Sequence, residues 1–183
     1  MKIYKDEALE NRLLDICKKH KLSHIGSCTS ALPIIDYIYQ VKGPKEKFIL
    51  SAGHSGVALY VVIERHEGID AEKIFRDHGI HATKCLACHV HCSTGSLGNG
   101  LPIALGMAMA NRNRNVYCMI SDGECMEGSV WEALRLADKF RVENLKVFVN
   151  ANGWGGMDEI NRDVLERRLS NFFPVIFVRT EPS

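Results

Sequence analysis

Two short apolar runs, each followed by a polar motif and separated by one helical segment, constrain the fold of this chain more than any other feature. Residues 116–120 and 145–149 are rich in β-branched and aromatic residues, which is typical of buried parallel strands. The segment between them carries apolar residues at helical spacing, namely Val130, Trp131, Leu134, Ala137 and Phe140. A strand, a helix and a second strand form a right-handed crossover that brings both motifs to the carboxyl ends of the strands. The pattern predicts an α/β fold with its ligand site at that edge of the sheet.

The two polar motifs supply the groups that a metal-bound diphosphate requires. Ser121-Asp122-Gly123-Glu124 follows the first run, and Asn150-Ala151-Asn152-Gly153 ends the second. Asp122 offers a carboxylate and Asn152 an amide oxygen, both hard ligands of the kind that Mg²⁺ prefers. Gly123 lets phosphate approach the backbone without a Cβ in the way. An Asp-Gly pair alone is usually only a turn, so the interpretation depends on the second motif.

The remaining periodicity predicts further elements around this unit. Helices are expected over residues 6–20, 29–40, 54–67, 71–78 and 97–111, and a short strand over 48–50. Pro33 is expected to interrupt the second helix early. Residues 79–96 lack periodicity and are the expected active-site loop. The chain contains no repeat or linker, so residues 1–183 are predicted to form a single domain.

Composition narrows the class of protein. The 183 residues are 46% hydrophobic and 25% charged, enough apolar material for a full core, and the net charge of +1 favours neither nucleic acid nor an anionic membrane as a partner. No apolar run reaches the length of a membrane span, and the first residues do not open a signal peptide. Seven cysteines without a secretory signal predict reduced thiols and a cytoplasmic protein.

These motifs together resemble the N-terminal, diphosphate-binding domain of transketolases. Four further segments match that family in order: Ser23-His24-Ile25-Gly26, Leu50-Ser51-Ala52-Gly53-His54, Gly79-Ile80-His81, and residues 93–102 from Ser93-Thr94-Gly95 to Leu101-Pro102. The resemblance implies a three-layer α/β/α fold with a mostly parallel sheet that binds thiamine diphosphate and Mg²⁺. The 2-oxo acid dehydrogenases share the metal motif but lack the other blocks, and deoxyxylulose-phosphate synthases are a weaker match.

The resemblance also implies roles for individual residues. Asp122, Asn152 and the backbone carbonyl of Trp154 match the metal ligands. Ser121 and the spacing of Asn150 and Asn152 depart from the family pattern, which could weaken cofactor affinity. The residues implied to contact the cofactor are Gly53, His54, Gly95, Ser96, Leu97, Gly98, Asp122, Gly123, Glu124 and Asn152.

Three histidines and two glutamates carry the remaining implied roles. A histidine in a single sequence is more often structural than catalytic, but His24, His54 and His81 lie in family motifs and are implied to contact the substrate and move protons. His24 and His81 are the clearer candidates, because His54 lies beside the diphosphate. Glu127 and Glu132 match an interface relay between paired cofactors, although a surface carboxylate such as Glu132 is usually only solvated.

The segment from residue 85 to residue 92 departs from the family pattern and leaves three interpretations open. It contains a Cys-x-x-Cys-His string, the attachment signature of c-type haem, which the lack of an export signal argues against. It also offers up to five zinc ligands, Cys85, Cys88, His89, His91 and Cys92, although a zinc site usually needs further ligands from elsewhere. The third interpretation is a cysteine-rich loop over the substrate pocket that alters substrate choice.

Transketolase chemistry needs a glutamate that protonates the aminopyrimidine of the cofactor, and in the family it belongs to a separate pyrimidine-binding domain. That domain does not follow in these 183 residues. We therefore expect half of a split transketolase, either a minimal subunit or a truncated chain, completed by a second chain in an α2β2 heterotetramer. It would transfer two-carbon ketol units between sugars or sugar phosphates. The alternatives are a synthase or lyase acting on another 2-keto donor, and a non-catalytic regulatory subunit.

Overall fold

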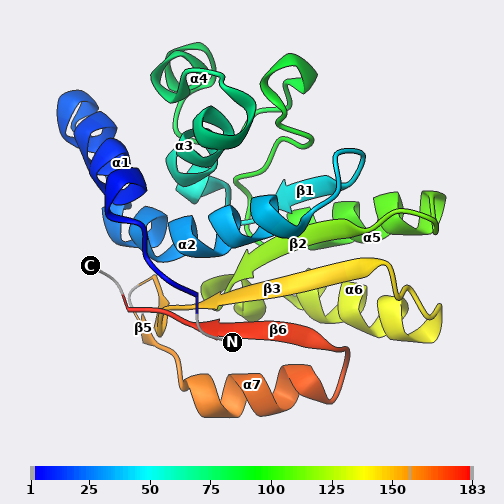
Figure 1. Cartoon of the computed structure of the whole chain (residues 1–183). Coiled ribbons are helices and arrows are strands. Elements are labelled where there is room, and N and C mark those ends of the chain that lie inside the picture. Colours follow the sequence, from blue (N-terminus) through cyan, green and yellow to red (C-terminus); the bar gives the residue numbers. More distant parts are fainter. Residues whose placement is uncertain (1–2, 157, 182–183) are drawn as a thin grey trace.

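The sheet consists of four parallel strands in the order β1-β2-β3-β6. The computed structural model describes residues 3–156 and 158–181 (Figure 1). The strands are β1 (Lys47–Leu50), β2 (Val116–Ser121), β3 (Leu145–Ala151) and β6 (Val175–Arg179). The β2 to β3 crossover contains α6 (Gly128–Lys139), as the spacing of its apolar residues predicts. The three-layer α/β/α fold and its parallel sheet are therefore confirmed.

Helices cover both faces of the sheet, and successive strand residues point to opposite cores. On one side lie α1 (Glu7–His20), α2 (Ile25–Val41), α3 (Gly56–Glu67) and α4 (Ala71–His78), sharing a core with Phe48, Met119 and Phe148. On the other lie α5 (Gly100–Ala110), α6 and α7 (Arg162–Ser170), whose core includes Cys118 and Val147. Because successive residues of β2 and β3 face two different apolar cores, both of these strands look continuously apolar in the sequence.

Two predicted helix boundaries are wrong. The helix expected to begin at residue 29 begins at Ile25 and runs through Pro33 to Val41. Proline removes one backbone hydrogen bond and strains the preceding turn, but the flanking Ile34, Ile35 and Ile38 are fully buried in the core and hold the helix together. The helix expected from residue 97 begins at Gly100, because Gly98 has a φ of +77° and breaks the helical path before it.

The other predicted elements lie within a few residues of their observed bounds. The segment predicted as a helix from residue 54 divides into a 3-10 turn over Gly53–Ser55 and α3, while α4 matches its prediction. Two antiparallel strands that the sequence analysis did not predict, β4 (Trp154–Gly155) and β5 (Asp158–Glu159), follow the second polar motif. Among the described residues, no helix is both long and apolar enough to cross a membrane.

The prediction that all cysteines are reduced thiols is wrong for one pair. Cys85 and Cys88 are joined by a disulfide in the loop between α4 and α5, at a Cα–Cα distance of 5.1 Å. The cysteines at positions 17, 28, 92, 118 and 125 are free. Only two residues separate the cysteines, and the 3-10 turn over Leu86–Cys88 brings the pair within bonding distance.

Candidate active site

A cleft of about 340 Å³ opens at the carboxyl ends of β2 and β3. Both polar motifs that end these strands lie on its wall, as the parallel arrangement predicts. The glycine-rich loop before α5 and three histidines from separate segments complete the wall. The predicted site residues that line the cleft are His24, His54, His81, Gly95, Leu97, Asp122, Gly123, Asn152 and Trp154.

A larger cavity of about 460 Å³ lies at the opposite edge of the sheet. It is bounded by the beginnings of β3 and β6 and by the end of α6, where Val142, Phe173 and Ile176 make it largely apolar. Ligands of open α/β sheets bind at the carboxyl ends of strands, so we assign the site to the smaller cleft.

Asp122 is the buried anionic group of the cleft, with only 1% of its surface exposed. Its Oδ2 accepts a hydrogen bond from the backbone N–H of Gly153 at 2.6 Å, and its Oδ1 accepts one from Gly123 at 3.0 Å. Removal from water raises the pKa of Asp122, and these backbone donors oppose the rise. The bond to Gly153 joins the two polar motifs directly.

The second motif presents oxygen atoms to the same part of the cleft. The Oδ1 of Asn152 accepts a hydrogen bond from the backbone N–H of Trp154 at 2.9 Å, which forms a tight turn before β4. Gly123 lies against this turn, because a Cβ at that position would be 3.3 Å from the Cα of Gly155 and 3.6 Å from the carbonyl oxygen of Trp154. This turn carries the Asn152 amide oxygen and the Trp154 carbonyl, and Asp122 is hydrogen-bonded to its Gly153 N–H, so three hard oxygen donors belong to linked segments.

Three histidines converge on the cleft from the start of α2, the turn after β1 and the loop after α4. The rings of His24 and His54 have centroids 5.4 Å apart. Burial, together with the proximity of His24 and His81, lowers the pKa of His54 to about 4. His54 is therefore a neutral imidazole at pH 7, able to donate one hydrogen bond and accept one. His24 has a φ of 62°, a left-handed conformation that begins α2.

Glu124 lies behind the cleft and is fully buried. Its Oε1 accepts hydrogen bonds from Ser51 Oγ at 2.6 Å and from the Gly98 N–H at 2.9 Å, and its Oε2 accepts one from the Ser121 N–H at 3.0 Å. These bonds connect the ends of β1 and β2 to the glycine-rich loop. Glu124, predicted as a cofactor contact, thus holds three segments of the site wall together.

The other predicted cofactor residues, Gly53, Ser96 and Gly98, lie outside the cleft wall. A Cβ on Gly53 would lie 2.5 Å from the carbonyl carbon and oxygen of Thr94, so only glycine permits this approach. Gly98 is buried, whereas Ser96 is exposed and absent from the cleft wall. The structure does not bring Glu127 or Glu132 into the cleft either: both are exposed, and Glu132 pairs with Arg135 at 2.8 Å.

Sequence reasoning missed several polar residues of the site. Ser27, Ser55 and Asn150 line the cleft, and Asn150 also joins separate segments. The Asn150 amide donates to Ser30 Oγ at 3.0 Å and its Oδ1 accepts from Thr180 Oγ1 at 2.7 Å. Ser27 and Ser55 closely follow the His24 and His54 motifs in the sequence, and that closeness could have identified them as residues of the site.

The cysteine-rich loop brings together a different set of residues from the one considered in the sequence. Among the described residues, the group with metal-ligand proximity is His78, Cys85 and Cys88, whose ligand atoms lie within 4.8 Å of one another. His89, His91 and Cys92 do not belong to it. His78 comes from the end of α4, outside the segment from which the ligands were expected.

Comparison with known proteins identifies the family. A family model described as "Transketolase, thiamine diphosphate binding domain" matches residues 12–163. The chain belongs to this family. A transketolase of Pongo abelii is 32% identical, with 81% of this chain and 28% of that protein covered. One of the subunits of the apulose-4-phosphate transketolase of Phocaeicola vulgatus is 30% identical, with 80% and 59% covered.

Solved transketolases share the fold. The transketolase from Leishmania mexicana superposes with a TM-score of 0.73 at 20% identity, covering 98% of this chain and 37% of that chain. The transketolase from Campylobacter jejuni superposes with a TM-score of 0.69 at 18% identity, covering 96% and 38%. The chain thus corresponds in length to 28% of the animal transketolase and to little more than a third of these solved chains.

Proposed function

We propose that this chain is the diphosphate-binding part of a transketolase that is completed by a second chain. The supporting observation is that one cleft contains two sets of residues: oxygen donors that suit a metal-bound diphosphate, and three histidines that suit a substrate. In this proposal residues 1–183 act as one domain in the cytoplasm, and the complete enzyme transfers two-carbon ketol units from a ketose to an aldose.

The oxygen donors at the ends of β2 and β3 fit Mg²⁺. The ligands would be the Asp122 carboxylate, the Asn152 amide oxygen and the Trp154 carbonyl, with diphosphate oxygens and water completing the octahedral shell that Mg²⁺ demands. Both oxygens of Asp122 retain a lone pair beyond their backbone hydrogen bonds. A divalent cation would favour the ionised carboxylate and offset the rise in pKa that burial causes.

The histidines and the glycine-rich loop would complete the substrate side of the cleft. Thiamine diphosphate supplies carbanion stabilisation when bound. Gly95 and Leu97 would pack on the cofactor, together with Gly53, Ser96 and Gly98 behind them. His24 and His81 would donate hydrogen bonds to oxygen atoms of the sugar. His54 is neutral at pH 7, so it would offer one hydrogen-bond donor and one acceptor to the substrate.

The second chain would carry the pyrimidine-binding domain and the glutamate that activates the cofactor. The Phocaeicola relative is named as one lettered subunit of its transketolase, which supports a divided enzyme. The same name supports a sugar phosphate as substrate. Apolar residues exposed on α5, including Ile103 at 39% and Met109 at 38%, offer a surface for contact with the second chain. In an α2β2 assembly, Glu127 and Glu132 would lie near the interface and form the relay between paired cofactors.

Reconstitution with the pyrimidine-domain chain of the same organism tests the proposal. We expect ketol transfer from a ketose phosphate to an aldose when the two chains are mixed with thiamine diphosphate and Mg²⁺, and none with either chain alone. Cofactor binding without donor cleavage would instead identify a regulatory subunit. Donor cleavage without transfer to an aldose would favour the synthase or lyase alternative.

A further inference from the structure

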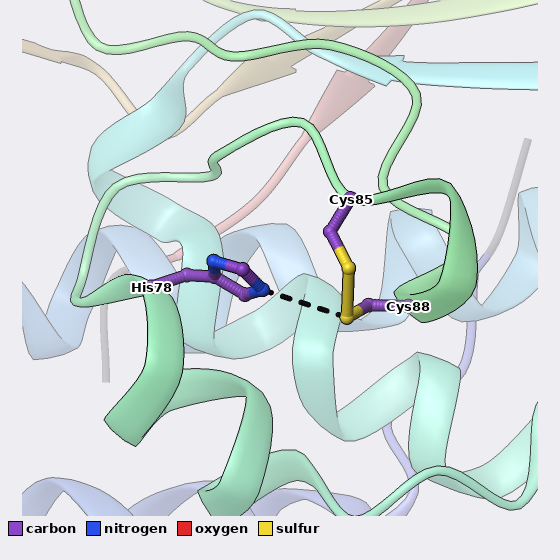
Figure 2. Close-up of side chains that lie close together, drawn as sticks. All are labelled: His78, Cys85 and Cys88. Carbon is purple, nitrogen blue, oxygen red and sulfur yellow. Dashed lines mark hydrogen bonds between the residues drawn. A yellow bond between two sulfur atoms is a disulfide. The ribbon is translucent and has the colours of Figure 1, made fainter.

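Three metal-ligating side chains from two segments meet outside the cleft (Figure 2). His78 is the last residue of α4; in the following loop, Cys85 precedes a 3-10 turn and Cys88 ends it. We propose that these three residues form a zinc site in the reduced chain, anchoring to α4 the loop that carries His81. The proposal is independent of the proposed cofactor chemistry.

The separation of the ligand atoms suits one tetrahedral ion. The Sγ of Cys88 lies 3.5 Å from the Nε2 of His78. Zinc–sulfur and zinc–nitrogen bonds of about 2.3 Å and 2.0–2.1 Å at a tetrahedral angle place the two ligand atoms about 3.5 Å apart. All three ligand atoms lie within 4.8 Å of one another, so small side-chain rotations suffice to bring Cys85 into the same shell.

The backbone holds the cysteine pair in a closed turn. The N–H of Cys85 donates to the Val90 carbonyl, and the N–H of Val90 donates to the Cys85 carbonyl, both at 2.9 Å. His89 turns the chain with a φ of 58°. His78 reaches the pair from the carboxyl end of α4, where the partial negative charge of the helix favours a cation. The backbone of the cysteine turn is therefore held by hydrogen bonds in which the two sulfur atoms take no part.

Of the neighbouring candidates, His89 and Cys92 have other contacts, and His91 lies outside the group whose ligand atoms are within 4.8 Å of one another. His89 Nδ1 lies 3.5 Å from Glu67 Oε1, and the Cys92 thiol donates to the Ser93 carbonyl at 3.3 Å. The site therefore has three protein ligands, and water takes the fourth position, as in zinc sites that keep one position open. Thr94 fastens the far end of the loop, since its Oγ1 donates to the Leu50 carbonyl at 2.6 Å. Zinc would close the near end, so the loop that carries His81 would be held at both ends.

Metal binding requires that the disulfide first be reduced. A dithiol breaks the S–S bond by supplying two electrons and two protons and is itself oxidised to a disulfide. A phosphine supplies the two electrons and becomes a phosphine oxide with the oxygen of one water molecule, whose two protons complete the thiols. Each thiol releases its proton when zinc binds, which leaves two thiolates and one neutral imidazole as ligands. The oxidised chain, by contrast, has no thiolate to offer at this position.

Cobalt titration of the phosphine-reduced full chain tests the site. We expect one Co²⁺ per chain, with thiolate charge-transfer absorption in the near ultraviolet and visible bands of tetrahedral cobalt, both displaced by Zn²⁺. Cys85→Ser and Cys88→Ser should each lose the charge-transfer absorption, and His78→Asn should weaken binding. The matched controls Cys92→Ser and His89→Asn should bind as the unaltered chain does, and circular dichroism should show every variant folded.

Two results would overturn the proposal. One is a reduced, folded chain that binds no stoichiometric Co²⁺ or Zn²⁺. The other is binding that persists in a folded Cys85→Ser, Cys88→Ser double variant or is lost in Cys92→Ser, because either would place the metal elsewhere. Unlike failure of ketol transfer, these results concern only the metal and leave the cofactor cleft unaffected.

Discussion

Burial determines the chemistry of two single residues in the cleft. Desolvation raises the pKa of Asp122, and two backbone N–H groups work against the rise by stabilising the carboxylate. Desolvation lowers the pKa of His54 to about 4, assisted by His24 and His81. Neither environment can be deduced from a motif, because both depend on the segments that close over the residue.

Asp122→Ala should abolish Mg²⁺-dependent binding of thiamine diphosphate in the assembled complex. We expect affinity to fall at least about 100-fold, since even outer-shell partners of a metal site account for 10- to 100-fold. Asp122→Asn keeps the shape and should fail similarly, because it lacks the charge. Calorimetric titration would measure this, with the exposed Asp15→Asn as control. Unchanged affinity in both Asp122 variants would show that the metal site is misassigned.

His54 should make the fold less stable as pH falls below neutrality. An unfolded histidine takes up a proton near its model value of 6.5, whereas folded His54 stays neutral until about pH 4. Between pH 6.5 and pH 4 the unfolded state therefore binds more protons than the folded state. The contribution of His54 to the free energy of unfolding should be fully present above pH 6.5 and decline toward pH 4, by roughly 1–3 kcal/mol for this partly exposed group. Urea unfolding at a series of pH values would detect it.

The matched variants for that measurement are His54→Gln and His89→Asn. The first should show a shallower loss of stability between pH 6.5 and 4, because the buried titrating group is gone. The second removes an exposed histidine, and asparagine tolerates its left-handed backbone, so the original slope should remain. An identical slope in all three chains would contradict the assignment to His54.

Among the elements, the turn after β1 and the loop before α5 are held together without any regular pairing. Glu124 accepts hydrogen bonds from both, and Gly53 allows their backbones to touch. The sequence analysis placed these residues in one site from their motifs. It missed that α2 continues unbroken through Pro33 and that α5 starts late, because the first depends on core packing around Pro33 and the second on the positive φ of Gly98.

Gly53→Ala should disrupt this junction. Its Cβ would lie 2.5 Å from the Thr94 carbonyl, and relieving the overlap must move one backbone segment, at a cost of about 1–3 kcal/mol or more. Gly106→Ala is the matched control, since nothing lies within 4 Å of its Cβ position in α5 and alanine should stabilise the helix by about 1 kcal/mol. Denaturant unfolding of both variants would separate the effects, and equal stability would refute the close contact.

For the whole molecule, the exposed side of α5 is an apolar surface that a second chain could cover. Pro102, Ile103, Gly106 and Met109 are exposed there although all are apolar or small. The opposite side of the helix packs on β2 and α6 through Leu101, Ala104 and Ala108. Small residues thus allow close packing on the inner side of α5, and the apolar outer side supports the proposed contact with a second chain.

Ile103→Glu should leave the chain folded and weaken assembly with the pyrimidine-domain chain. A carboxylate buried at an apolar contact should raise the dissociation constant at least about tenfold, or 1.4 kcal/mol. Sedimentation of the mixed chains would measure the loss, with Arg167→Glu on the exposed face of α7 as control. Assembly unaffected by Ile103→Glu would show that α5 is not the contact.

Strand and helix periodicity and the motifs at strand ends are local properties of the sequence, and they predicted the α/β fold and the edge of the sheet that carries the cleft. The layered arrangement and most of the predicted residues that line the cleft came from the resemblance to transketolases. Packing of the folded chain determined which groups are buried and which distant segments meet. It turned Glu124 inward, kept Glu127 and Glu132 exposed and outside the cleft, and brought His78 rather than His89 to the cysteine pair. Such contacts depend on how the segments pack in three dimensions, which the spacing of residues along the chain does not determine.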